Sequence, residues 1–235
     1  MARLARLAGI AALALAVLAG CAAPAQLGDV AAAISAQSGV DSRARSEKTL
    51  TLVLVRNDGT INPSVESPLQ LEAMFAMIPG GLGGAPLDND RLLVPASFGK
   101  PFRLDMAALE KSASAHATEP SVEFFEQGFS ISPPQTRLLR VGTFMFDAGN
   151  KRIIAGGAIN DADLKSGYLL MYFDRPCRIV GHTQTGGIER NIDVKIDVSG
   201  LHWLKEHEVA AGKRVIEADD GQAAALFRVQ EPPPR

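Results

Sequence analysis

The chain contains little cysteine, no large excess of either charge and, after its first 20 residues, no long apolar run. Its 24 basic side chains nearly balance its 26 acidic ones, and they do not cluster as nucleic-acid-binding surfaces require. The apolar run at 7–19 is shorter than the roughly 20 residues that a membrane-spanning helix needs. We therefore expect neither a nucleic-acid partner nor a transmembrane helix.

The N-terminal residues have the order of a secretory signal. Arg3 and Arg6 form a short basic start, an apolar stretch follows at 7–19, and the stretch ends in Leu18-Ala19-Gly20-Cys21. This order resembles the lipobox of bacterial lipoproteins, and the resemblance covers only the first 21 residues. It implies that lipid is attached to the thiol of Cys21 and that the chain is cut between Gly20 and Cys21. The alternative is an ordinary signal peptide, with Cys21 carrying no lipid.

The lipobox resemblance also implies a location. Several acyl chains hold a protein stably on a membrane, since each buried CH2 contributes about 0.8 kcal/mol. Ala22 rather than Asp follows Cys21, which in lipoproteins of Gram-negative bacteria indicates release to the outer membrane. The expected location is the periplasmic face of the outer membrane, with the membrane as a partner through the N-terminal lipid.

Lipidation of Cys21 leaves Cys177 as the only other cysteine, so no intramolecular disulfide is available and packing alone must hold the core. Cys177 stands between Pro176 and the apolar pair Ile179 and Val180. We predict a buried, inert thiol, because an unpaired cysteine behaves as a small apolar side chain. The alternatives are a reactive nucleophile and an intermolecular bridge.

Composition divides the chain into four parts. Residues 1–20 form the predicted signal peptide. Residues 21–47, rich in Ala, Ser, Gln and Gly, comprise the lipidated cysteine and a flexible tether that spans about 30 Å. Residues 48–230 form one β-rich periplasmic domain, and 231–235 a proline-rich tail.

Alternation of apolar and polar residues indicates a mainly β fold. The clearest strand is 189–198, where Ile192 and Val194 face one way and Asp193 and Lys195 the other. Other strands are predicted at 48–55, 137–146, 151–154, 168–173, 178–183, 201–209, 213–218 and 224–229. Spacings of about ten residues between turn signals predict an antiparallel β-sandwich or open barrel. We expect two hairpins, which join 137–146 to 151–154 and, through Asp220-Gly221, 213–218 to 224–229.

Residues 60–134 are predicted to be an irregular insert, because 9 of the 14 prolines fall there. Two short helices fit between the helix-breaking residues, at 69–78 and at 105–117 with Asp105 as the N-cap. Short strands are predicted at 91–94 and 122–125. The large apolar side chains of 69–78 are expected to fill the core, with an exposed contact patch as the alternative; they are Met74, Phe75, Met77 and Ile78.

Motif spacing assigns no catalytic residue, no metal ligand and no cofactor. His202 and His207 lie five apart, so a continuous strand points them to opposite faces, whereas metal ligands must converge. The aromatic candidates are Tyr168, Tyr172 and Trp203. Tyr168 and Tyr172 share a strand face, and outward-facing rings would make a platform on which a sugar stacks.

Three functional hypotheses follow from these patterns. The first is a lipid-anchored cell-envelope protein that acts as a non-enzymatic binding or scaffold module for another envelope protein. The second is a carbohydrate- or peptidoglycan-binding module, or a hydrolase acting on glycans. The third is a carrier of a hydrophobic ligand, which uses the apolar segment 69–78.

Overall fold

The computed structural model describes residues 49–57, 70–81, 86–87, 90–126, 128–161, 164–219 and 224–230. The predicted signal peptide, the predicted lipobox with Cys21, the predicted tether and the proline-rich tail lie outside these residues. The prediction of a mainly β fold with short helices between 60 and 134 is confirmed.

Thirteen strands and two helices are found among the described residues. The strands are β1 (Thr49–Val55), β2 (Leu71–Pro79), β3 (Arg91–Pro95), β4 (Pro101–Asp105), β5 (Phe129–Ser132), β6 (Leu138–Asp147), β7 (Arg152–Asn160), β8 (Ser166–Phe173), β9 (Cys177–Thr185), β10 (Ile188–Ile196), β11 (Gly200–Ala210), β12 (Lys213–Asp219) and β13 (Ala224–Gln230). The helices are α4 (Met106–His116) and α5 (Val122–Glu126).

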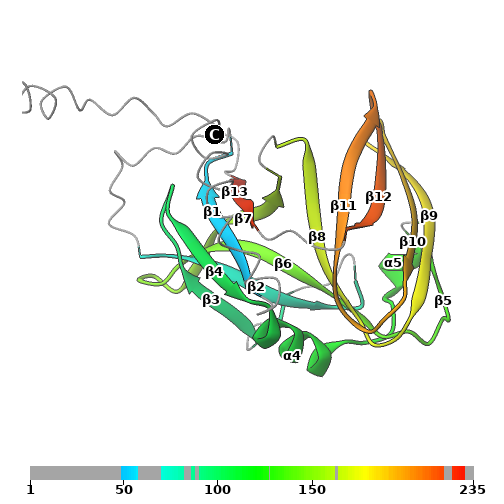
Figure 1. Cartoon of the computed structure of the whole chain (residues 1–235), viewed down its shortest axis with the longest axis horizontal. Coiled ribbons are helices and arrows are strands. Elements are labelled where there is room, and N and C mark those ends of the chain that lie inside the picture. Colours follow the sequence, from blue (N-terminus) through cyan, green and yellow to red (C-terminus); the bar gives the residue numbers. More distant parts are fainter. Residues whose placement is uncertain are drawn as a thin grey trace, which may run out of the picture.

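All thirteen strands belong to one mixed sheet that does not close into a barrel (Figure 1). Its main path runs β4-β1-β13-β7-β6-β8-β11-β12-β10-β9-β5, and β2 and β3 branch from β6. Most pairings are antiparallel, but β1 pairs with β13 and β10 with β12 in parallel. Parallel neighbours cannot be joined by a tight turn, so these two pairs bring distant segments of the chain together.

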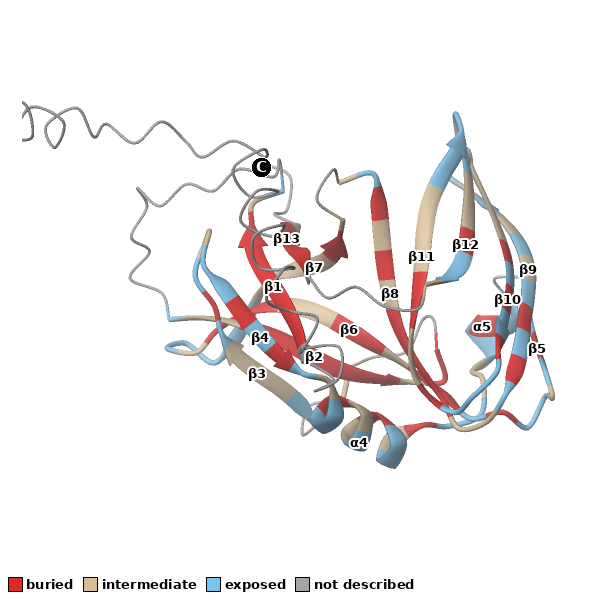
Figure 2. Cartoon of the chain, viewed as in Figure 1, coloured by how far each residue is buried: buried red, intermediate tan, exposed pale blue. Residues whose placement is uncertain are grey.

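The sheet buries two main cores, and β8 contributes to both of them. Tyr168, Leu170 and Tyr172 enter the first core, together with residues of β1, β2, β6, β13 and α4. Met171 and Phe173 enter the second core, with residues of β5, β9, β10, β12 and α5. Alternate residues of a strand point to opposite faces, so β8 is covered on both sides, as its continuous apolar run requires (Figure 2).

The prediction of a helix at 69–78 is wrong, because this segment forms β2. It lies between β3 and β6 and hydrogen-bonds to both. The side chains of Phe75 and Met77 face the first core, and those of Met74 and Ala76 are buried on the opposite face. A strand buried on both faces is apolar throughout and has no period that separates it from a buried helix. The predicted core role of these side chains is confirmed.

The prediction of a strand at 122–125 is also wrong, because these residues form the short helix α5. Its first turn begins after Ser121, whose hydroxyl oxygen accepts a hydrogen bond from the Phe124 amide at 3.3 Å. Only Phe124 of α5 is buried, whereas Val122 and Phe125 are exposed. Helix α4 begins where it was predicted, since Asp105 Oδ1 accepts from the amides of Ala107 and Ala108 at 2.9 and 3.0 Å.

The hairpin predicted between 213–218 and 224–229 does not form. Strand β12 pairs with β11 and β10, and β13 pairs with β1 and β7. Strand β1 is buried on both faces, so the backbone N–H and C=O groups along each of its edges need hydrogen-bond partners from a neighbouring strand. β13 supplies the partners for one edge. Phe227 of β13 also packs edge-on against Phe75 and Phe102, with ring centroids 5.9 and 6.1 Å apart. This burial overrides the local turn signal. The other predicted hairpin, β6 with β7, is confirmed.

Candidate functional site

The predicted aromatic platform is not exposed. Tyr168, Tyr172 and Trp203 do share one side of the sheet, but each is at most 8% exposed and belongs to the first core. Tyr168 and Trp203 pack edge to face, with centroids 6.0 Å apart. The hydroxyl of Tyr172 donates to Ser114 Oγ on α4 at 3.1 Å. These rings stabilise the fold and offer no stacking surface to a sugar.

The error concerns the face and not the periodicity. A platform requires the tyrosines to point outward, which they would do if their neighbours Leu169 and Met171 alone pointed inward. Met171 does point into a core, but it is the second core on the other side of β8. Because both sides of β8 are covered, inward-facing neighbours do not expose the tyrosines.

Cys177 is buried and free, as predicted. Burial, with a smaller contribution from the nearby Asp174 carboxylate, raises the pKa of the Cys177 thiol to about 11. Because the thiolate is the reactive form, a thiol with this pKa is a poor nucleophile at neutral pH. Cys177 therefore belongs to the second core and not to a site.

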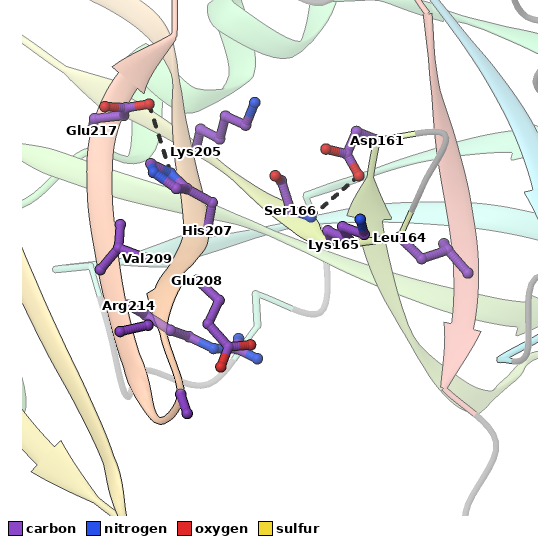
Figure 3. A pocket seen from close by; sticks show the side chains of 12 residues that line it. Asp161, Leu164, Lys165, Ser166, Lys205, His207, Glu208, Val209, Arg214 and Glu217 are labelled. Carbon is purple, nitrogen blue, oxygen red and sulfur yellow. Dashed lines mark hydrogen bonds and ion pairs between the residues drawn. The ribbon is translucent and has the colours of Figure 1, made fainter.

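A strand-end recess of about 840 Å³ opens beside the outer ends of β8, β11 and β12 (Figure 3). Its charged lining is Asp161, Lys165, Lys205, His207, Glu208, Arg214 and Glu217. The two signs are nearly balanced. The strand-end recess therefore has a polar surface without a strong preference for either charge.

Three residues of the strand-end recess have the composition of a hydrolase triad. Ser166 of β8 lies directly opposite His207 of β11, and His207 Nδ1 lies 3.6 Å from Glu217 Oε1 of β12 (Figure 3). That separation is too long for a hydrogen bond, and Nδ1 has no other hydrogen-bond partner among the described residues. No side-chain hydrogen bond joins Ser166 to His207 in the described part of the chain either. The imidazole thus lacks the contacts that orient a catalytic histidine.

A second recess of about 480 Å³, here called the arginine recess, lies where β6 changes partners. β6 pairs with β8 at 138–141 and with β7 at 144–147, while β7 and β8 pair only near their shared turn. The strands therefore part on either side of Gly142 and Thr143. The charged residues that line the arginine recess are Arg140, Lys165, Glu206, Arg214 and Arg228.

The arginine recess carries a strong excess of positive charge, since four of its five charged residues are basic. Its one carboxylate, Glu206, is already paired: Oε1 accepts from Arg190 Nε at 2.8 Å and from Arg214 Nη1 at 3.4 Å. The side chains of Arg140 and Arg228 form no hydrogen bond or ion pair with any described residue, and the Nε atom of each is buried. Burial lowers the pKa of the Arg140 guanidinium, which nevertheless remains charged at neutral pH.

The two recesses meet at Leu164, Lys165 and Arg214, which line both of them. Across the residues that the structure describes, no three His, Cys, Asp or Glu side chains gather as metal ligands do. None of the described helices has the length and apolar character needed to cross a bilayer. No protein-family model matches the chain, and no curated protein and no solved structure is significantly similar to it.

Sequence reasoning missed the arginine recess. A signal was present, since Arg140 and Arg228 each interrupt an apolar strand, in Leu138-Leu139-Arg140-Val141 and in Leu226-Phe227-Arg228-Val229. A charged residue in the middle of such a strand is rare unless it is paired or functional. The convergence of the two arginines depends on β13 lying beside β7, which the local turn signal did not predict.

Proposed function

We propose that this protein is a lipid-anchored outer-membrane protein whose β domain is a non-enzymatic binding module of the cell envelope. The anchor and the location rest on the resemblance of residues 1–21 to a lipobox. The binding role rests on the arginine recess, which faces solvent at the parting of β7 and β8 and holds two arginines without a partner among the described residues.

The unpartnered arginines carry the proposal for a physical reason. Desolvating a guanidinium costs several kcal/mol unless an anion compensates for the lost hydration. If these charges bound nothing, apolar side chains at both positions would make the fold more stable. A ligand that meets the charges explains why they stand in the wall of a recess instead.

The experiment that tests the binding role is site-specific photo-crosslinking in intact cells. A photoreactive residue replaces Leu164, which lines both recesses, and a control chain carries it at Val198, which is 62% exposed outside both recesses. We expect one defined envelope component to be attached through position 164 and not through position 198. Equal products from both positions, or none from either, would contradict an envelope partner at the recesses.

A second candidate function, hydrolysis at the strand-end recess, is favoured by one observation: Ser166 and His207 are direct cross-strand neighbours with Glu217 beside the imidazole. A fluorophosphonate probe labels serines that a histidine activates. If this hypothesis is right, the probe labels the wild type, does not label Ser166→Ala and labels His207→Gln only weakly. If the wild type stays unlabelled while a known serine hydrolase in the same reaction is labelled, the hypothesis is excluded.

A further inference from the structure

Two arginines from different strands line the arginine recess. Arg140 comes from β6 and Arg228 from β13, and the two strands are separated in the sheet by β7. Arg228 lies opposite Ala158 of β7, and Arg140 lies opposite Met171 of β8. Both arginines line the same recess, although their strands are distant in the sequence.

The positive potential of the arginine recess is not cancelled from inside the described structure. Glu206 is shared between Arg190 and Arg214, so its charge is already compensated. Lys165 lines both recesses but has an interaction of its own, so the uncompensated charge is that of Arg140 and Arg228. Partly desolvated cations that converge on one cavity raise the local concentration of anions.

We infer that the arginine recess binds the phosphate group of an organic ligand, held by Arg140 and Arg228. Each guanidinium offers parallel N–H donors that match two phosphate oxygens. A phosphate monoester carries more than one negative charge at neutral pH, which suits two unpaired cations better than a single carboxylate does. The inference rests on the proposed binding function and names its ligand class.

The size of the arginine recess indicates that phosphate is only part of the ligand. A volume of about 480 Å³ lies within the range of small-molecule sites, about 300–1,000 Å³, and exceeds what one phosphate fills. The half-buried Phe144 and the backbone of Gly156 and Gly157 supply uncharged wall for the rest of the ligand. A soluble phosphate monoester and the monoester headgroup of phosphatidic acid both have this chemistry.

Isothermal titration calorimetry of the full chain in non-ionic detergent tests the inference. The probes are inorganic phosphate, glycerol 3-phosphate and monomeric dihexanoyl phosphatidic acid, each at constant ionic strength. We expect at least one probe to bind to the wild type and to lose affinity at least tenfold in Arg140→Gln and in Arg228→Gln. The control Arg103→Gln, which removes an exposed arginine of β4, is expected to bind as the wild type does.

The probes distinguish the two possible sources of the phosphate group, a soluble ester and a lipid headgroup. Tighter binding of glycerol 3-phosphate indicates a soluble ester, and tighter binding of phosphatidic acid indicates a lipid headgroup. The inference is also supported, without any variant, if phosphate raises the melting temperature of the wild type and chloride at equal ionic strength does not. Binding of acetate or citrate in place of every phosphate probe overturns it, as does unchanged affinity in both arginine variants.

The calorimetry and the crosslinking experiment test two separate claims, so either claim can be wrong without the other. If no phosphate probe binds while position 164 still captures an envelope component, the phosphate inference is wrong and the binding module stands. If phosphate binds and position 164 captures nothing, the ligand site stands and the proposed envelope partner is wrong.

Discussion

Arg140 is the residue at which stability and binding are expected to conflict. Its guanidinium is desolvated in the wall of the arginine recess and has no anionic partner among the described residues. Replacing an uncompensated charge by an apolar side chain of similar length removes the desolvation penalty.

We therefore predict that Arg140→Met raises the free energy of unfolding by about 1 kcal/mol. Urea denaturation followed by circular dichroism measures it. The matched control is Arg103→Met on the exposed face of β4, which is expected to change stability by less than about 0.5 kcal/mol. A clear loss of stability in Arg140→Met would show that the arginine serves the fold.

Asp147 gives the fold a dependence on pH at the turn between β6 and β7. Its buried carboxylate accepts from the side-chain amide of Asn150 and from the backbone amides of Gly149 and Asn150. These hydrogen bonds, the one from the Asn150 side chain foremost, lower the pKa of Asp147 below its ordinary value of 3.8. Because the folded-state pKa is depressed, the stabilisation is complete above that ordinary value and is lost as the pH falls through the folded value.

Asp147→Asn is accordingly expected to be less stable than the wild type near neutral pH, since the amide keeps an acceptor but not the charge. The difference in unfolding free energy should shrink steadily below about pH 4. Urea midpoints of both proteins across the acidic range measure it. A difference that is constant with pH would show that the charge of Asp147 contributes nothing.

At the scale of elements, β13 is the strand that joins the start of the domain to its centre. It pairs in parallel with β1 and antiparallel with β7, and its Phe227 contacts Phe75 of β2 and Phe102 of β4. Phe227 is fully buried. The aromatic side chain therefore connects β13 to two strands that lie far from it in the sequence.

We predict that Phe227→Ala lowers the free energy of unfolding by about 3–5 kcal/mol, because it removes apolar contacts and leaves a cavity. Thermal and urea unfolding measure the loss. Phe125→Ala on α5, whose side chain is 47% exposed, is the control and is expected to cost less than about 1 kcal/mol. Equal effects of the two substitutions would contradict the central role of β13.

Strand positions were far more predictable than strand partners. The alternation in β10 and the cap of α4 at Asp105 are local signals, and both predictions are confirmed. β4 and β5, which have five and four residues, were missed although their side chains alternate between buried and exposed. The pairing of β13 with β1 is not local, so no turn signal between neighbouring segments could reveal it.

The whole molecule combines an expected anchor with a described β domain. Cys21 lies outside the described residues, so its lipidation remains a prediction from the lipobox resemblance. Cys21→Ala is expected to abolish incorporation of labelled palmitate and to remove the protein from the outer-membrane fraction. Cell fractionation with immunoblotting measures both, and Cys177→Ala serves as the control, because that thiol is buried and should carry no lipid. Labelled palmitate retained in Cys21→Ala would exclude the lipobox interpretation.

The sequence by itself determined the expected cellular location, most strand positions and the N-cap of α4, because these depend on the order of neighbouring residues. Only the tertiary structure decided that Tyr168, Tyr172 and Trp203 are buried, since a period of two gives the two faces of a strand and not which of them is covered. Only the tertiary structure brought Arg140 and Arg228 into one recess, because that depends on the long-range pairing of β13 with β7.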